Sequence, residues 1–119
     1  MDDETDFFFE NPYSWNKEAN IVYLESPAGV GYSYCEDMNE CDFDDVSGSI
    51  DNLEALRTWY DKFPSYKSHE LYITGESYAG VYVPYLAYQI DQFNNNETTK
   101  VEEKINLKGI MVGNGVTDW

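Results

Sequence analysis

The fold of this chain is decided by residues 71–80, which read LYITGESYAG. An apolar, β-rich run at Leu71–Thr74 leads directly into a segment of mostly small residues, Gly75–Gly80. The first run predicts a strand buried on both faces, and the small residues predict a sharp turn. Apolar residues then recur at helical spacing up to Phe93, with Pro84 expected to kink or restart the helix. We therefore expect a strand, a tight turn and a helix in direct succession.

Similar patterns lie on both sides of this unit. Asn20–Leu24 and Leu107–Val112 are β-rich apolar runs, and both are predicted strands. Ser47–Phe63 carries apolar residues every three or four positions, so it is a predicted helix that Pro64 ends. The order strand, helix, strand, helix, strand, with long connections, predicts the α/β class with a parallel central sheet. Residues 1–10 are expected to be irregular.

Composition and length exclude several classes of protein. The chain has 119 residues with 23 acidic and 7 basic side chains, so its net charge of −16 argues against nucleic-acid binding. Its aromatic content of 17% is too high for a disordered acidic tail. The sequence contains no apolar run of about 18 residues, the length needed to span a membrane. Its acidic amino terminus does not resemble an export signal. This length allows at most one domain and is short for the α/β class.

Two loop features bear on modification and on ligands. Cys35 and Cys41 could form a small local disulfide in an oxidising compartment, or they could be free thiols. Residues 96–98, Asn-Glu-Thr, form a glycosylation triplet at Asn96 in a polar loop. The acidic residues Asp42, Asp44 and Asp45 lack the spacing of a calcium loop, so we expect a solvated loop and no metal site.

Ser77 is the candidate catalytic residue. A serine placed between a buried strand and a helix fits a nucleophile elbow, in which a strained turn lifts the hydroxyl above the sheet. Gly75 and Ala79 provide the small side chains that this close approach of strand and helix needs. The amino terminus of the helix aims backbone N–H groups at a developing oxyanion. The alternative is an ordinary serine that caps a helix.

Four segments make the chain resemble a known family. Their sequences are NPYSWN at residues 11–16, ESPAGVGYSY at 25–34, GESYAGVYVP at 75–84 and NLKGIMVGN at 106–114. They are similar to serine carboxypeptidases, including the cathepsin A type, in the same order and at plausible spacing. The resemblance implies that residues 1–119 are part of an α/β-hydrolase domain.

The resemblance also implies roles for residues. Ser77 would be the acylated nucleophile, and the backbone N–H of Tyr78 would form half of the oxyanion hole. Gly75, Ala79 and Gly80 would shape the elbow. Glu76 would bind the terminal carboxylate of the substrate, so it must be protonated or share a proton with another carboxyl group.

The expected activity is removal of C-terminal residues from peptides or proteins, without cofactor or metal. The parent enzyme would work in a lysosome, in a vacuole or outside the cell. Its oligomeric state stays open.

The catalytic machinery is incomplete in these residues. Serine needs a general base, and His69 is the one histidine in the sequence. At roughly 3.3 Å per strand residue, His69 lies about 20 Å from Ser77 and cannot serve. The triad order of this fold places Asp and His after the serine, so we expect both beyond Trp119. The family's Asn-Gly-Gly-Pro-Gly segment should lie before Asn11.

Two consequences and two alternatives follow. We expect the chain alone to be inactive, and also poorly folded, because a missing strand would leave sheet edges exposed. One alternative is a relative that transfers acyl groups or splits cyanohydrins with the same elbow. The other is an inert truncated gene product or an acidic interaction module.

Overall fold

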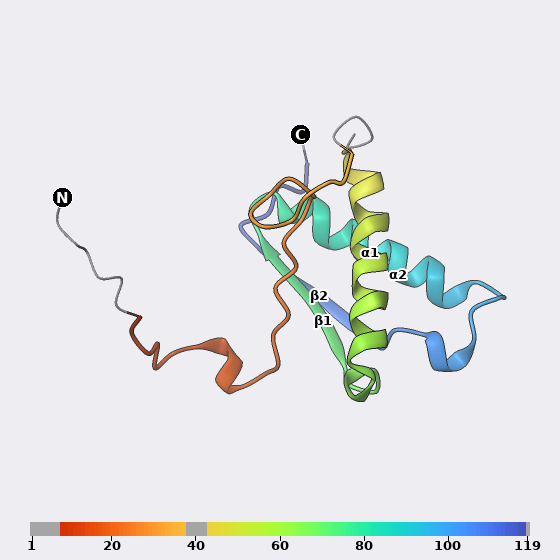
Figure 1. Cartoon of the computed structure of the whole chain (residues 1–119), viewed down its shortest axis with the longest axis horizontal. Helices are drawn as coiled ribbons and strands as arrows, with labels where there is room; N and C mark the ends of the chain where they lie inside the picture. The colour runs from red at the N-terminus through yellow and green to blue at the C-terminus, as the bar shows by residue number, and fades with distance from the viewer. Residues whose placement is uncertain (1–7, 38–42, 119) are drawn as a thin grey trace.

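The computed structural model describes residues 8–37 and 43–118. In these described residues, two α-helices alternate with two strands: α1 (Asp45–Lys62), β1 (Leu71–Glu76), α2 (Ala79–Asn95) and β2 (Leu107–Gly113). Short 3₁₀ turns lie at Trp15–Lys17, Pro64–Tyr66 and Val101–Glu103. Helix α2 packs against both strands, and α1 packs against α2 (Figure 1). The α/β arrangement expected from the sequence is confirmed.

Helix α1 begins at a capping box. The side chain of Asp44 accepts the backbone N–H of Ser47 at 2.7 Å, and Ser47 Oγ accepts the N–H of Asp44 at 3.0 Å. Accepting that N–H also lowers the pKa of Asp44 below its ordinary value. The helix ends at Lys62, just before Pro64, so the predicted helix at Ser47–Phe63 is confirmed with a slightly earlier start.

Strands β1 and β2 are parallel neighbours, joined by α2. Their register runs from Leu71 opposite Leu107 to Glu76 opposite Gly113. Helix α2 passes through Pro84 as one helix, so the predicted restart does not occur, and it continues to Asn95. Its buried face carries Val83, Leu86 and Ile90, as the apolar spacing predicts, together with Gly80. The β1–α2–β2 unit therefore sets the geometry of the turn between β1 and α2.

The core lies between the two helices and the covered face of the sheet. Its buried members are Tyr60 from α1, Leu86 and Ile90 from α2, and Ile105 ahead of β2. Ile90 is completely buried. Asn94, near the end of α2, binds the backbone of Ile105 through two hydrogen bonds. Its Nδ2 donates to the Ile105 carbonyl and its Oδ1 accepts the Ile105 N–H, both at 2.8 Å. Burial of these side chains is the main stabilising contribution to the unit.

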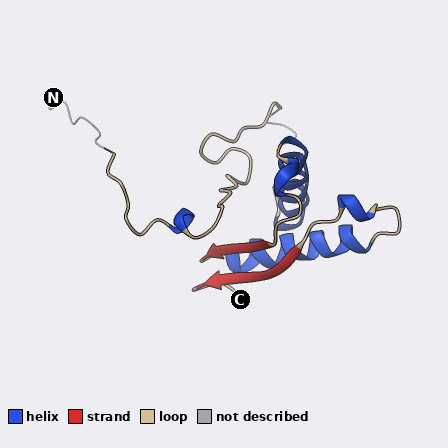
Figure 2. Ribbon diagram, turned by 90° about the horizontal axis from the view of Figure 1, so that it is seen from below, coloured by secondary structure: helices blue, strands red, loops and turns tan. Residues whose placement is uncertain are grey.

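The predicted strand at Asn20–Leu24 is wrong for this structure. These residues form no strand, and Val22 and Tyr23 are 50% and 84% exposed. A strand needs a hydrogen-bonded neighbour, and the described residues provide the segment with none. Figures 1 and 2 show residues 8–20 running out to one side of the helices and strands.

Within the described residues, no helix combines the length and apolar character needed to cross a bilayer. The connection between α2 and β2, which contains the polar loop expected around Asn96, includes a 3₁₀ turn at Val101–Glu103.

Candidate active site

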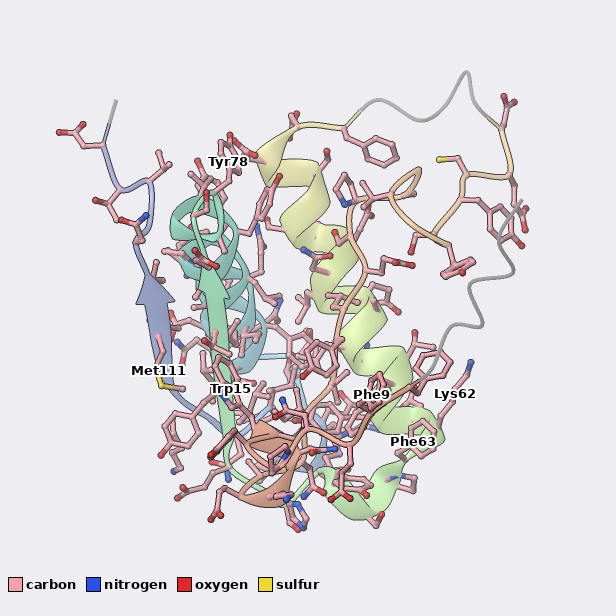
Figure 3. The ribbon with its side chains drawn as sticks, turned by 90° about the vertical axis from the view of Figure 1, so that its left-hand side faces the viewer. Phe9, Trp15, Lys62, Phe63, Tyr78 and Met111 are labelled. Carbon is pink, nitrogen blue, oxygen red and sulfur yellow. The ribbon has the colours of Figure 1, made fainter. Side chains whose placement is uncertain are left out.

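Ser77 lies on a strained turn between β1 and α2, as the sequence predicts. Its φ angle is 60°, in the left-handed region that non-glycine residues rarely adopt. The residue is exposed in the described part of the chain. In Figure 3, the neighbouring Tyr78 marks the site at the upper end of β1, close to the start of α1. This is the conformation that a nucleophile elbow requires.

The backbone of Ser77 is held by three hydrogen bonds. Its N–H donates to the carbonyl of Gly113 at 3.1 Å, and its carbonyl accepts the N–H groups of Val116 at 2.9 Å and Gly80 at 3.0 Å. The turn after β2, where Asn114 also has a positive φ of 45°, therefore supports the elbow. The sequence alone gives no indication that this turn contacts Ser77.

Small residues are required on both sides of the elbow. A Cβ atom added to Gly75 would collide with the Cβ of Ala79, and one added to Gly80 would collide with the backbone of Val116. Gly115 approaches Gly80 so closely that its added Cβ would lie 3.2 Å from the Gly80 Cα. The requirement for small residues at Gly75 and Ala79, inferred from sequence, thus has a direct steric cause.

Tyr78 connects the elbow with α1. Its phenol Oη donates a hydrogen bond of 3.0 Å to Oδ2 of Asp45, the first residue of α1. Its ring also contacts Tyr82, one turn along α2, with 4.9 Å between the centroids. The bond to Asp45 raises the pKa of the Tyr78 phenol, and burial raises it further. From the sequence, Asp45 is expected in a solvated loop.

The other predicted site residues fall into two groups. Glu76 is the last residue of β1, is exposed, and directly precedes Ser77 in the chain. His69 precedes β1 and packs edge-on against Tyr66, at a centroid distance of 5.3 Å. The length of β1 separates it from Ser77 by about 20 Å, so the two do not meet.

Cys35 is disulfide-bonded. Cys41 lies outside the described residues, as does Asp42 of the acidic run. Asp44 and Asp45 make the helix-cap and tyrosine contacts described above. Asn96 is exposed at the far end of α2 from the elbow.

The segment at residues 25–34 folds back on itself around one glutamate. Glu25 Oε2 accepts the backbone N–H of Tyr32 at 2.7 Å, and the Glu25 carbonyl accepts Ser33 Oγ at 2.6 Å. Gly29 and Gly31 have positive φ angles of 91° and 56°, which glycine adopts at little cost. The loop and α1 line an open hollow of about 520 Å³.

Comparison with known proteins gives consistent matches. The family model described as serine carboxypeptidase matches residues 1–119. Serine carboxypeptidase 24 of Arabidopsis thaliana is 50% identical over 109 residues, which cover 91% of this chain and 23% of that protein. Serine carboxypeptidase-like 21 of the same plant is 48% identical over 108 residues, covering 91% of this chain and 21% of the relative.

A solved structure also matches. It is Kex1(delta)p, a prohormone-processing carboxypeptidase from Saccharomyces cerevisiae, with a TM-score of 0.77 and 24% identity. The match covers 91% of this chain and 24% of that one, and it shows a shared fold. The chain therefore spans between a fifth and a quarter of the length of these proteins.

Proposed function

The chain belongs to the serine carboxypeptidase family, and from that premise we propose that it carries the nucleophile of an enzyme that removes C-terminal residues from peptides. The observation that carries this proposal is the exposed Ser77 at φ 60°, held between β1 and α2. An ordinary helix-capping serine does not need this strained conformation or the small residues packed around it. The proposal concerns the whole protein, of which these residues form one part.

The reaction proceeds through an acyl-enzyme. Ser77 Oγ attacks the carbonyl carbon of the last peptide bond while a general base takes its proton. The oxyanion that forms accepts the backbone N–H of Tyr78, which begins the turn into α2. The C–N bond then breaks, the departing amino acid takes the proton from the base, and water later releases the acyl group.

The general base comes from residues outside this sequence. His69 is too far from Ser77, so the histidine and its carboxylate partner, as well as the second oxyanion donor, belong to flanking sequence. The 119-residue chain alone is then inactive. The complete enzyme works in a lysosome, in a vacuole or outside the cell.

Glu76 recognises the terminal carboxylate of the substrate. Its place beside Ser77, one residue earlier on β1, supports this role. A carboxylate would repel another carboxylate, so Glu76 acts either as a protonated hydrogen-bond donor or by sharing a proton with another carboxyl group. Peptide cleavage should therefore be favoured in acid.

The test uses the protein extended to the length of its relatives. A peptide with a free C-terminus should be shortened by one residue at a time, while the same peptide with an amidated C-terminus should be cut much more slowly. Ser77→Ala should abolish both reactions. Transfer of an acyl group to an alcohol without peptide cleavage would assign the protein to the acyltransferase relatives instead. Cleavage that persists in Ser77→Ala would overturn the proposal.

A further inference from the structure

The connection between α2 and β2 contains the one Asn-x-Ser/Thr triplet of the sequence, at residues 96–98. Asn96 follows the last residue of α2 and is exposed, and its backbone N–H closes the helix by donating to Phe93 at 3.3 Å. Thr98 is exposed as well. The triplet is therefore accessible from solvent along its whole length.

The side chains of the triplet already face each other. Oδ1 of Asn96 accepts two hydrogen bonds from Thr98, from its backbone N–H at 2.9 Å and from its hydroxyl at 2.8 Å. In the part of the chain that the structure describes, no hydrogen bond engages Nδ2 of Asn96. Donors on the amide oxygen stabilise negative charge there, so they ease loss of a proton from Nδ2. The nitrogen is thus both free and activated.

The side-chain amides of the two preceding asparagines, Asn94 and Asn95, are both engaged in hydrogen bonds through Nδ2. Asn94 is half-buried, and both ends of its amide are bonded to the backbone of Ile105. Nδ2 of Asn95 donates to Asp91 at 3.0 Å. Neither has a hydroxyl residue two positions later. Asn96 is therefore distinct from its neighbours in both sequence and structure.

The position is compatible with catalysis. Helix α2 runs 17 residues from the elbow to Asn95, a length of about 25 Å at 1.5 Å per residue. A large group on Asn96 would stay clear of Ser77. The disulfide at Cys35 independently indicates an oxidising compartment, which is the environment in which asparagine residues are glycosylated.

We propose that Asn96 carries an N-linked glycan. The donor is an oligosaccharide attached through a pyrophosphate to a membrane lipid. Nδ2 forms a bond to the anomeric carbon of the sugar and loses one proton, while the bond from that carbon to the pyrophosphate breaks. The lipid pyrophosphate leaves with the bonding electrons, so no oxidant or reductant is needed.

The test is glycopeptide mass spectrometry of the extended protein, produced in eukaryotic cells behind a cleavable signal peptide. Both the secreted and the intracellular membrane-enclosed material are digested, and the peptide containing Asn96 is analysed before and after treatment with peptide-N-glycosidase. The expected result is a glycosylated peptide that the enzyme converts to Asp at position 96. Loss of the signal peptide, read from the intact mass, shows that the chain entered the secretory pathway.

Four variants make the outcome specific. Asn96→Gln and Thr98→Ala should lose the glycan, Thr98→Ser should keep it, and Asn95→Gln, the matched control, should leave it unchanged. Protein that has lost its signal peptide but is unmodified at Asn96 would overturn the proposal. So would a glycan that survives in Asn96→Gln. This inference stands or falls independently of the proposed enzymatic function.

A second inference comes from the hydrogen bond between Tyr78 and Asp45. We infer that Asp45 is a positioning residue that orients the backbone N–H of Tyr78, and this inference rests on the proposed function. Tyr78 is fixed at its phenol by Asp45 and at its backbone by the turn into α2. Helix α1, which carries Asp45, is in turn tied to α2 by the bond from Gln89 to the buried Ser49 at 3.1 Å. The contact therefore links the elbow to α1, which packs against α2.

The test compares Asp45→Ala and Asp45→Asn in the extended enzyme. We expect Asp45→Ala to lower kcat about ten- to hundredfold with KM little changed, because a small displacement of a catalytic group is costly. Asp45→Asn keeps a hydrogen-bond acceptor and should restore most of kcat. An unchanged kcat in Asp45→Ala, or equal losses in both variants, would overturn the inference. Ser77→Ala serves as the reference, because activity that survives it would refute the proposed function whatever Asp45 does.

Discussion

Residues 45–113 and residues 8–37 are both rich in apolar and aromatic side chains, yet only the first segment forms helices and strands beyond a single 3₁₀ turn. In the first segment, β1, α2 and β2 follow one another along the chain and pack together. In the second, Phe8, Trp15 and Tyr23 are largely exposed.

The difference shows that the presence of neighbouring elements to pack and pair with, rather than amino-acid composition, decides whether an apolar segment forms a strand or helix. The β1–α2–β2 unit supplies its own neighbours within about forty residues, which is typical of such a unit. The run at Asn20–Leu24 has the composition of a buried strand, but its neighbours would come from elsewhere in a longer protein. The elbow belongs to the first kind of region, and so its geometry is present without the rest of the enzyme.

The largest expected effect concerns hydrogen exchange. Although the sequence predicts poor folding of the chain alone, the paired strands of the structure predict that β1 amides of the 119-residue chain exchange more slowly than those of Asn20–Leu24 by orders of magnitude. In the described residues β1 pairs with β2, whereas Asn20–Leu24 pairs with no strand. In the extended protein, the amides of Asn20–Leu24 should become protected from exchange as well. Hydrogen-exchange mass spectrometry measures both. Equal exchange in the two segments of the short chain would erase the distinction between the regions, and would support the prediction that the chain alone is poorly folded.

A core substitution should come next. Ile90→Ala removes the completely buried side chain of α2 and should lower the free energy of unfolding by about 2–5 kcal/mol. Val22→Ala, in the unpartnered segment, should change it by less than about 0.5 kcal/mol in the 119-residue chain. Exchange of the β1 amides reports both values. A similar cost for the two variants would mean that Val22 has partners after all.

A third test adds a methyl group inside the elbow. Gly75→Ala should destabilise the extended protein by about 1–3 kcal/mol, because the new Cβ collides with Ala79. The double variant Gly75→Ala with Ala79→Gly should recover part of this loss, as urea titration can show. No recovery would indicate that the contact with Val83, whose Cγ2 lies 3.2 Å from the added Cβ, rather than the contact with Ala79, sets the cost.

The smallest effect should come from the cap of α1. The pKa of Asp44 is lowered in the folded state, so its stabilising contribution is present above the unfolded pKa and is lost as the pH falls through the folded one. Asp44→Ala should lower the melting temperature slightly at neutral pH, and the gap to wild type should shrink below a pH of about 4. The side chain introduced by Asp44→Asn does not titrate, so its oxygen should accept the Ser47 N–H equally well at every pH, and the stability difference from this variant should not depend on its own protonation. A gap that grows in acid would contradict the assigned cause.

Sequence patterns predicted the local features well. The helices, the two paired strands and the strained turn at Ser77 all depend on neighbours within the β1–α2–β2 unit and α1, so periodicity and turn residues were sufficient. The bond from Tyr78 to Asp45, and the support of Ser77 by Gly113 and Val116, could not be predicted in this way. They join residues far apart in the sequence, and only the packing of the elements brings them together.

The central claim is that Ser77 is an elbow nucleophile whose general base lies outside these residues. The direct measurement is labelling by a fluorophosphonate probe, detected by intact mass, on the 119-residue chain and on the extended protein, each with its Ser77→Ala variant. We predict an adduct only on the extended wild-type protein. An adduct on the short chain that disappears in Ser77→Ala would show that a base is present within it, and labelling of the extended protein that persists in Ser77→Ala would show that Ser77 is not the nucleophile.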